Sequence, residues 1–315
     1  MKFITLLLFW CTLSTLTAQT GAPNSYSDIL KNSQTKIEML FPEGKSKALI
    51  LSYDDGPYQD RKLVDLMNKY DLKGTFHLNS NKLDLPNYLT KAEIKDLFKG
   101  HEVSVHSANH PNLTALSKID IMYEVIEDRR ELERLSGTTV RGMAYPFGNY
   151  NASVLDAIQG VGIAYARTVY DTYNFTIPHN FLAWHPSIHQ FGKAYFAPNQ
   201  PEVDKKEIAA FTQLVGNFLK SDTLALLDVW GHSWEMGDSK EKWDAMEQFF
   251  KTVAHNPSIC YIKQIDLVDY IHAYENLQFG VDKKLVTNLS SLDIYIKKAG
   301  KTFKVSAGTT TLLLE

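Results

Sequence analysis

Short apolar runs alternate with helix-like segments through most of the chain. The first run, residues 48–51, predicts a buried strand, and the spacing of Leu63, Leu66 and Met67 predicts a helix at residues 61–70. Further strands are expected at residues 74–78, 102–105, 142–145, 163–166, 224–230 and 260–262, and further helices at residues 91–98, 117–135, 152–158, 205–219, 241–253 and 264–274. This alternation is typical of parallel βα units, and roughly seven such units favour a barrel over an open sheet.

The longest predicted helix, residues 117–135, has clear start and stop signals. Ser117 is a suitable N-cap, and Gly137 is a suitable C-terminal stop. Three apolar residues share one stripe and are expected to face the core: Ile119, Tyr123 and Ile126. The charged residues at positions 127–133, Asp128 among them, are interpreted as a solvated face.

The pattern changes after about Phe279. Short strands are expected at residues 285–286, 292–296, 303–305 and 310–314, with a turn at residues 299–301. We interpret residues 278–315 as a small β appendage, or alternatively as an extra edge of the main sheet. Residues 35–277 then form the larger domain.

The N-terminus predicts export. Lys2 is followed by an apolar run at residues 3–13 that is too short to span a membrane but suits a signal peptide. Cleavage near Ala18 or Gln19 would remove residues 1–19, including Cys11, and leave Cys260 as a lone cysteine without an internal disulfide partner. The mature protein is therefore expected in the periplasm or outside the cell, without a membrane span.

The composition of the chain limits the kinds of binding partner that are expected. Hydrophobic residues make up 44% of the chain and charged residues 22%, and the formal net charge is -3. A nucleic acid or an anionic membrane requires a basic surface, which this balance does not favour. No glycine-rich phosphate loop follows a predicted strand, and nothing in the pattern indicates an oligomeric state.

Polar residues gather where predicted strands end, which is where parallel α/β folds place their catalytic groups. Residues 52–57 read Ser-Tyr-Asp-Asp-Gly-Pro, directly after the first strand. The adjacent carboxylates of Asp54 and Asp55 repel each other unless a cation lies beside them. One of the two can then bind the cation while its neighbour acts as a base. A simple Asp-Asp cap in a loop is the alternative.

Histidines follow two other predicted strands. His106 and His110 are spaced i, i+4, which places both imidazoles on one face of a helical turn and allows them to bind one ion. His232 follows the strand at residues 224–230 and is a candidate general acid. A second pair at this spacing, His185 and His189, lies in an irregular stretch and is interpreted as loop structure or as part of the substrate rim.

Together these segments resemble the polysaccharide deacetylase family, carbohydrate esterase family 4, also called the NodB-homology domain. Its first motif, Thr-Phe-Asp-Asp-Gly-Pro, corresponds to residues 52–57, and its second, His-Ser/Thr-x-x-His-Pro, is matched in full by residues 106–111. The resemblance implies a distorted (β/α)7 barrel that acts on polysaccharide. It also implies that Asp54 is the catalytic base and His232 the acid, and that Asp55, His106 and His110 hold a divalent metal, most commonly Zn²⁺ and sometimes Co²⁺ or Ni²⁺.

The third family motif differs here. Residues 144–148 read Ala-Tyr-Pro-Phe-Gly where the family often has Arg-x-Pro-Tyr, so another arginine, Arg141 or Arg167, would have to orient the base. For the fourth motif, only Asp171 and Trp184 are loose candidates. Six residues are expected to contact substrate: Tyr145, Pro146, Phe147, Trp184, Trp230 and Trp234.

The predicted activity is removal of N-acetyl groups from a polysaccharide that contains N-acetylglucosamine. Two alternatives stay open at this point. One is an esterase that removes O-acetyl groups from a xylan-type polymer. The other is a non-catalytic relic that retains the metal and binds carbohydrate.

Overall fold

The structure is a computed structural model that describes residues 35–191 and 201–314. The predicted signal peptide, residues 1–19, lies outside these ranges. Among the residues described, no helix is both long and apolar enough to cross a membrane.

A parallel sheet forms the centre of the molecule, in the order β6-β5-β4-β3-β2-β8-β7, with β9 pairing the start of β2. Its strands are β2 (Lys47–Asp55), β3 (Thr75–Leu78), β4 (Glu102–Val105), β5 (Gly142–Ala144), β6 (Tyr165–Arg167), β7 (Ile188–His189), β8 (Ala225–Gly231) and β9 (Ile259–Tyr261). All were expected within a few residues, except β7, which is only two residues long and lies in a stretch without periodicity.

The two edges of the sheet are joined by one connecting segment. Trp184 exchanges backbone hydrogen bonds with the β6 side, where its N–H donates to Ala166 O (3.0 Å) and its carbonyl accepts from Thr168 N (2.8 Å). A few residues later, Ser187 N donates to Asp228 O of β8 (2.9 Å). The sheet therefore curls into the distorted (β/α)7 barrel that was predicted.

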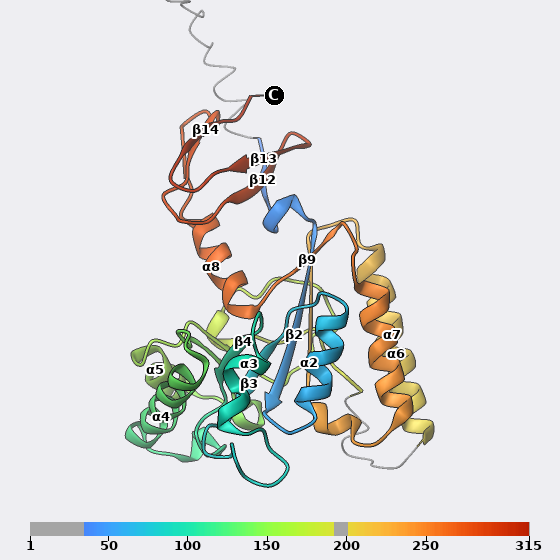
Figure 1. The fold of residues 1–315 in the computed structure, drawn as a ribbon. Coiled ribbons are helices and arrows are strands. Elements are labelled where there is room, and N and C mark those ends of the chain that lie inside the picture. The colour runs from blue at the N-terminus through green and yellow to red at the C-terminus, as the bar shows by residue number, and fades with distance from the viewer. Residues whose placement is uncertain (1–34, 192–200, 315) are drawn as a thin grey trace, which may run out of the picture.

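Helices cover the outside of the barrel (Figure 1). They are α2 (Asp60–Lys69), α3 (Ile94–Leu97), α4 (Lys118–Ser136), α5 (Ala152–Gly160), α6 (Pro201–Lys220), α7 (Lys240–Val253) and α8 (Gln264–Glu275). Short 3-10 turns occupy Pro42–Gly44, Lys91–Glu93, Leu113–Ala115, Pro146–Gly148, Phe181–Ala183 and Ser233–Met236. Helices α4 and α5 lie together on one side of the barrel, and α6 and α7 on the other.

Helix α4 has the predicted caps but presents the opposite face to the core. The Ser117 hydroxyl accepts from Asp120 N, and Gly137 adopts the left-handed conformation that ends the helix. The stripe formed by Ile119, Tyr123 and Ile126 is 78%, 61% and 42% exposed, so its predicted burial is wrong. The buried residues are Ile121, Val125, Asp128 and Leu132. Both stripes satisfy helical spacing, and only packing against β4 and α5 selects between them.

The C-terminal strands form two sheets of their own, here called the β unit, and are not an edge of the barrel sheet. Two three-stranded antiparallel sheets contain β1 (Ile37–Leu40), β12 (Ile294–Lys298) and β13 (Lys301–Val305) on one side, and β10 (Gln278–Phe279), β11 (Leu285–Thr287) and β14 (Thr310–Leu312) on the other. Strand β1 comes directly before the barrel in sequence, yet it pairs with β12.

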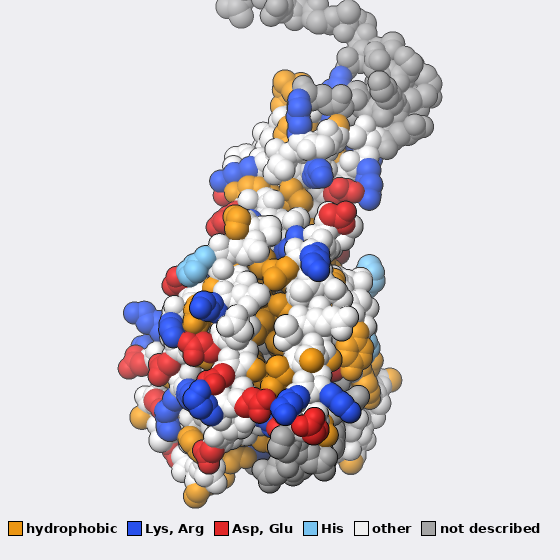
Figure 2. Space-filling view, turned by 90° about the vertical axis from the view of Figure 1, so that its right-hand side faces the viewer, with side chains coloured by type: hydrophobic (Ala, Val, Ile, Leu, Met, Phe, Trp, Pro, Cys, Tyr) orange, Lys and Arg blue, Asp and Glu red, His pale blue; other side chains and the backbone are white. Residues whose placement is uncertain are grey.

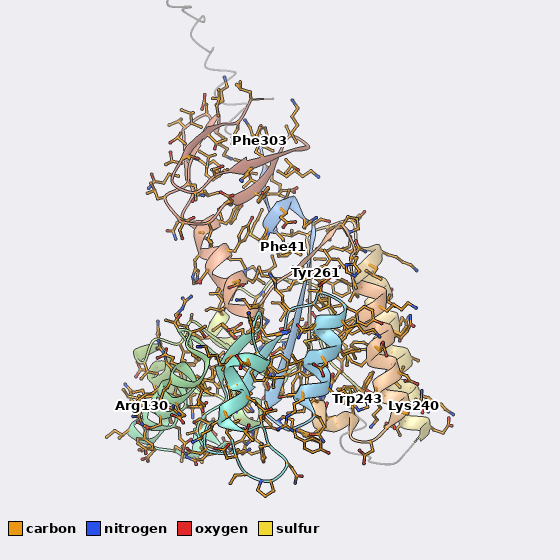
Figure 3. The ribbon with its side chains drawn as sticks, in the orientation of Figure 1. Phe41, Arg130, Lys240, Trp243, Tyr261 and Phe303 are labelled. Carbon is orange, nitrogen blue, oxygen red and sulfur yellow. The ribbon has the colours of Figure 1, made fainter. Side chains whose placement is uncertain are left out.

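Helix α8 and Phe41 connect this unit to the barrel (Figure 3). The Tyr270 hydroxyl of α8 donates to Leu40 O (2.7 Å) and accepts from Tyr295 N (2.8 Å). In Figure 1 the arrow of β2 points away from β12 and β13. The carboxyl ends of the barrel strands therefore lie at the end of the molecule opposite to the β unit.

Charges are mixed on the surface that carries α6 and α7. Figure 2 shows Lys and Arg side chains beside Asp and Glu over the lower part of this face, without a broad area of one sign. This distribution agrees with the small formal net charge of -3.

Candidate active site

A cavity of 810 Å³ opens at the carboxyl ends of the barrel strands. The five polar residues that the sequence singled out all line it: Asp54, Asp55, His106, His110 and His232. They come from the ends of β2, β4 and β8; β8 is next to β2 in the sheet, and β4 is separated from β2 by β3. The barrel thus brings together residues that are up to 178 positions apart in sequence, from Asp54 to His232.

Asp55, His106 and His110 have the spacing of metal ligands. Asp55 Oδ1 lies 3.7 Å from Nε2 of each histidine, and it accepts no hydrogen bond within the described ranges, although it is buried. These separations are too long for hydrogen bonds. They are close to the edge of a tetrahedron around Zn²⁺, about 3.3–3.5 Å for ordinary Zn–N and Zn–O bonds. A buried acceptor without a donor, facing two imidazole nitrogens, fits a divalent cation.

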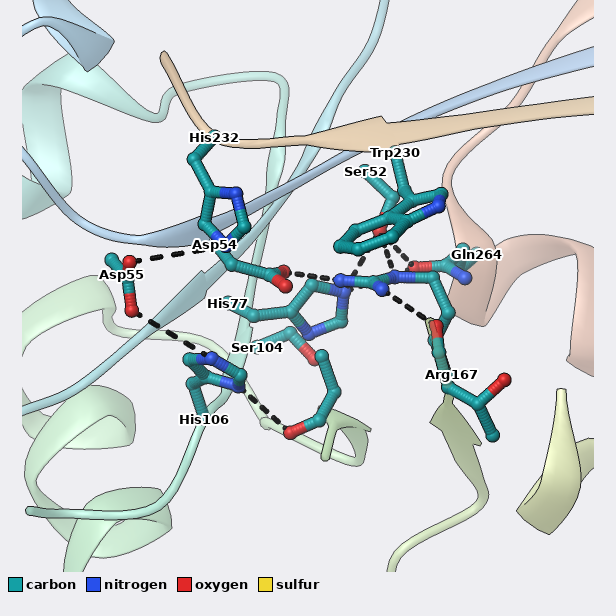
Figure 4. A network of polar contacts seen from close by, with 12 residues as sticks. Ser52, Asp54, Asp55, His77, Ser104, His106, Arg167, Trp230, His232 and Gln264 are labelled. Atoms are coloured by element: carbon teal, nitrogen blue, oxygen red, sulfur yellow. Dashed lines mark hydrogen bonds and ion pairs between the residues drawn. The ribbon is translucent and has the colours of Figure 1, made fainter. Parts of the chain in front are cut away.

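His106 is held in one tautomer. Its Nδ1 lies 2.8 Å from Ala144 O, and since the carbonyl can only accept, Nδ1 carries the proton and Nε2 presents its lone pair towards Asp55. Figure 4 shows the ring between the two partners. Metal-binding histidines are commonly oriented by such a bond to a backbone carbonyl.

The two histidines meet in a loop and not in the helical turn that we predicted. Ser107 and His110 have φ angles of 63° and 60°, which interrupt any helix, and residues 106–111 contain no helical turn. The i, i+4 spacing still brings the rings together, with centroids 4.7 Å apart. Burial lowers the pKa of both His106 and His110, so neutral imidazoles are favoured, as a metal ligand requires.

Of the two candidate arginines, Arg167 is the one that contacts Asp54. From the end of β6 its guanidinium forms a buried ion pair with Asp54, donates through Nε to Ser52 Oγ (2.9 Å), and donates through Nη1 to Thr168 O (2.8 Å). Figure 4 shows this fork directed at the Asp54 carboxylate. The other candidate, Arg141, pairs with Asp269 at the surface.

The environment of Asp54 keeps its carboxyl ionised. Burial alone would raise the pKa of Asp54, but the charge of Arg167, together with those of the nearby histidines, outweighs burial and holds the pKa well below the usual range. Behind the ion pair, Ser52 also contacts His77 Nε2 (3.1 Å) and Gln264 Oε1 (3.2 Å), all within the barrel. Asp54 is 2% exposed and is therefore a fixed acceptor at the cavity wall.

His232 has an acidic partner that sequence reasoning missed. Its Nδ1 lies 2.8 Å from Glu235 Oε1, and the same oxygen lies 2.8 Å from His189 Nε2. Burial alone would lower the pKa of His232, but the charge and hydrogen bond of Glu235, together with the charges of Asp55 and Asp54, outweigh burial and raise that pKa to about 9. The charges of both histidines hold the pKa of Glu235 well below its usual range, against the opposite effect of burial. The 2.8 Å separations are hydrogen bonds, which distinguishes this cluster from the Asp55 site.

His185 and His189 do not converge. His185 Nδ1 contacts Thr168 Oγ1 (2.6 Å), whereas His189 stacks on Trp230 with ring centroids 4.1 Å apart. The other face of Trp230 lies 4.8 Å from the Arg167 guanidinium carbon. His189 is thus part of the cavity wall, whereas His185 does not line the cavity.

Of the residues proposed from sequence to contact substrate, four line the cavity and two are buried away from it. Tyr145, Phe147, Trp230 and Trp234 line the cavity, with Phe147 58% exposed and the Trp234 indole donating to Asp55 Oδ2 (3.0 Å). Trp184 is fully buried under β6, so the prediction that its ring faces a ligand is wrong. Pro146 is also buried and does not line the cavity. Aromatic residues fill cores as readily as sites, and sequence cannot separate the two uses.

Two tyrosines on the rim were not predicted. Tyr170 and Tyr173 line the cavity and are 54% and 63% exposed. Asp171, the loose fourth-motif candidate, lies between them and accepts a hydrogen bond from Trp230 Nε1 (2.8 Å), not from His232. The sequence did contain a signal: Tyr170, three residues after Arg167, and Tyr173 lie on either side of Asp171.

Comparison with known proteins finds a family match over part of the chain. The polysaccharide deacetylase family model matches residues 42–166. The peptidoglycan-N-acetylglucosamine deacetylase PgdA of Listeria monocytogenes is 29% identical over 129 residues, which are 40% of this chain and 27% of PgdA. Chitin deacetylase 2 of Cryptococcus neoformans var. grubii is 30% identical over 115 residues, 36% of this chain and 24% of that protein. The chain therefore spans about a quarter of the length of these relatives.

A solved structure supports the fold over a longer range. A Mycobacterium smegmatis protein, named provisionally as a polysaccharide deacetylase, superimposes with a TM-score of 0.60 at 14% identity, covering 76% of this chain and 94% of that one. The resemblance to polysaccharide deacetylases noted from the motifs is confirmed, as is the barrel fold.

Proposed function

Because residues 42–166 match the polysaccharide deacetylase family, we propose that this protein is a metal-dependent hydrolase that removes N-acetyl groups from a polysaccharide containing N-acetylglucosamine. One observation carries the proposal. Asp55, His106 and His110 surround a point in the cavity at ligand spacing, and the ionised carboxylate of Asp54 lies directly beside them.

Asp55, His106 and His110 would hold the ion, which we propose to be Zn²⁺, with Co²⁺ or Ni²⁺ as substitutes. Three protein ligands leave a coordination position open, which is typical of catalytic and not structural zinc sites. When bound, such an ion polarises an acetyl carbonyl and lowers the pKa of water at the open position.

Asp54 is the proposed general base. Arg167 and other nearby positive charges hold its pKa low, so it is ionised at neutral pH and can accept the proton of the attacking water. The same guanidinium also bonds to Ser52 and Thr168, and this fixes the carboxylate in one orientation. Arg167 is thus the proposed positioning residue for the base, in place of the arginine that is absent at Ala144.

His232 is the proposed general acid. Glu235 orients its ring through Nδ1, which leaves Nε2 directed to the cavity, 3.9 Å from Asp55 Oδ2. The neighbouring Glu235 charge favours the protonated imidazolium. His232 can therefore donate a proton to the departing nitrogen, which without that proton would leave as an anion and be a poor leaving group.

The rim supports a sugar ligand. Phe147, Tyr170 and Tyr173 expose aromatic surface beside the ion site, and Tyr145, Trp230 and Trp234 complete the cavity wall. We propose that they contact the faces of the sugar rings, which are apolar. The relatives named for peptidoglycan and chitin make an N-acetylglucosamine polymer the first substrate to test.

Export and domain division complete the proposal. Residues 1–19 are proposed as a signal peptide that takes the protein to the periplasm or outside the cell. Residues 35–277 are proposed as the catalytic domain and residues 278–315 as the β appendage, to which β1 contributes a strand.

Acetate release tests the proposal. Purified protein with Zn²⁺ should release acetate from chitooligosaccharides, lose this activity with a chelator, and regain it when Zn²⁺ is restored. Asp54→Asn should retain the metal but lower turnover by at least about 100-fold, since it removes the base. Release from acetylated xylan alone would favour the esterase. Release from neither substrate by protein that binds metal would favour the carbohydrate-binding relic.

A further inference from the structure

A buried carboxylate behind the ion site connects two strand ends. Asp128, in the middle of α4, is 0% exposed, and its two oxygens accept different backbone N–H groups. Oδ1 accepts from Ser80, two residues after β3 (2.7 Å), and Oδ2 accepts from His106, the first residue after β4 (2.9 Å). One carboxylate therefore fixes the exits of two adjacent strands, and one of these exits carries a proposed metal ligand.

A second carboxylate holds the same loop one helical turn earlier. Glu124 accepts from Asn109 N (2.9 Å) and from Asn109 Nδ2 (2.7 Å), and its backbone carbonyl accepts from Ala108 N (3.1 Å). Glu124 and Asp128, which we call the α4 carboxylate pair, are spaced i, i+4 and so lie on one face of the helix. Between them they contact the loop from His106 to Asn109.

The loop needs such support because its backbone is strained. Ser107 and His110 both adopt positive φ, a region that non-glycine residues occupy only when their surroundings impose it. The β3 side adds Asn79, whose Nδ2 donates to His106 O (2.7 Å) and Ser107 O (2.8 Å). The contacts made by α4 and by Asn79 thus impose the conformation in which the two imidazoles meet.

We propose that Asp128, assisted by Glu124, is a positioning residue for the ion site, holding His106 and His110 in ligand geometry before an ion binds. The inference rests on the metal site of the proposed function. It gives a role to a helix whose charged residues the sequence pattern had assigned to a solvated face. For Asp128 that assignment is wrong, because the side chain points inward at the strand ends.

The test compares Asp128→Asn with a matched control, Glu127→Gln. Asparagine has nearly the same shape as aspartate, but its NH₂ group would face one of the two backbone N–H donors, Ser80 or His106, and cannot accept a hydrogen bond from it. Glu127 is the neighbouring carboxylate on α4 and pairs with Arg130 at the surface. Affinity for Zn²⁺ is measured by competition with a chromophoric chelator well below the unfolding temperature. The d–d absorption of the Co²⁺ form is recorded as a report of ligand geometry.

We expect Asp128→Asn to bind Zn²⁺ about 10- to 100-fold more weakly, the usual cost of losing support behind a metal ligand, and to change the Co²⁺ spectrum. Glu127→Gln should match the wild type in both. Zn²⁺ affinity and a Co²⁺ spectrum equal to those of the wild type in folded Asp128→Asn would overturn the inference, even if the unfolding temperature falls. If Asp128→Asn does not fold, Glu124→Gln tests the same support, with a smaller loss of affinity expected and an unchanged affinity as the contrary result.

Failure of the proposed function is separable from failure of this inference. A wild-type protein that binds Zn²⁺ but releases no acetate contradicts the hydrolase, while the effect of Asp128→Asn on affinity remains measurable. A wild-type protein that releases acetate, together with an Asp128→Asn variant of unchanged affinity, contradicts only the positioning role.

Discussion

At the scale of single residues, the base and its arginine form the most consequential pair in the molecule. Asp54 and Arg167 are 113 positions apart, and both are almost completely buried. A buried ion pair adds little net stability, but removing one partner leaves an uncompensated charge in the interior. Arg167 therefore affects both folding and catalysis, and the two effects require separate measurements.

Substitution of Arg167 should lower turnover without releasing the ion. Arg167→Lys keeps the charge but loses the fork that contacts Asp54, Ser52 and Thr168 together, so we expect kcat to fall about 100-fold from misplacement of the base. Arg167→Met should in addition cost about 3–5 kcal/mol of unfolding free energy. Zn²⁺ affinity should stay within a few-fold of wild type in Arg167→Lys, as checked by metal titration beside acetate kinetics.

Arg141→Met is the matched control for Arg167. Arg141 directly precedes β5, but it pairs with Asp269, and the two side chains are 37% and 39% exposed. It should keep wild-type turnover. A large loss in Arg141→Met, with Arg167→Lys unaffected, would mean that the base is oriented by the other arginine.

The sequence predicts site residues that have local signals and misses those defined by tertiary contacts. Asp54, Asp55, His106, His110 and His232 each follow an apolar run, which is enough to place them at one edge of the sheet. Arg167 was one of two candidate arginines, and only its contact with Asp54 distinguishes it from Arg141. Glu235 and Asp128 were not predicted, because their roles depend on contacts with other elements. Glu235 is only three residues after His232, so a contact between them could have been considered. A hydrogen bond in a 3-10 turn, however, leaves no distinctive sequence pattern.

At the scale of elements, the start of β4 shows how a polar side chain can connect several of them. Glu102 accepts hydrogen bonds from Tyr165 OH on β6 (2.8 Å), Thr75 Oγ1 on β3 (2.9 Å) and Ile265 N on α8 (3.1 Å). Burial raises the pKa of Glu102 to about 7, against the opposing effect of these bonds. The group therefore binds a proton more tightly in the folded chain than in the unfolded one.

This difference predicts a pH dependence of stability. From about pH 4.5 to about pH 7 the unfolded chain releases the Glu102 proton while the folded chain retains it, so unfolding becomes easier as pH rises through this window. Across this window the Glu102 proton should lower the free energy of unfolding by roughly 3 kcal/mol. Glu102→Gln has no proton to lose, so its urea midpoint should fall less than that of the wild type between pH 4.5 and pH 8.

Two other buried carboxyls, Asp128 and Asp228, also have a pKa raised to about 7 by burial, so the variant should flatten the dependence only in part. Asp65→Asn, at an exposed position on α2, should retain the full wild-type dependence. A Glu102→Gln curve parallel to that of the wild type would show that the Glu102 proton does not contribute.

Element positions were largely predictable, whereas the face that each presents was not. The bounds of α4 follow from Ser117 and Gly137, which act through their own backbone. Its orientation depends on β4 and α5, and Ile119 and Tyr123 remain exposed despite their spacing. Similarly, β7 is too short for periodicity to reveal, since it is defined by its pairing with β8.

At the scale of the whole molecule, the barrel and the β unit share one of the two hydrophobic cores. That core contains barrel residues such as Tyr165, Trp184 and Leu226 together with Ile294 and Ile296 of the β unit. The change of pattern after Phe279 predicted a β unit, but the contribution of β1 at residues 37–40 could not be predicted, because strand pairing across the length of the chain leaves no local trace.

A shared core predicts that the two parts unfold together. Ile296 is completely buried in β12, so Ile296→Ala should cost about 2–5 kcal/mol, whereas Leu289→Ala, at a position 68% exposed, should cost little. The four tryptophans among the described residues all lie in the barrel part of the chain, so tryptophan fluorescence reports unfolding of the barrel. In Ile296→Ala the fluorescence midpoint should fall together with the circular dichroism midpoint, in one transition. An unchanged fluorescence midpoint beside a separate, earlier circular dichroism transition would mean that the β unit unfolds independently, and that its core does not stabilise the barrel that carries the site.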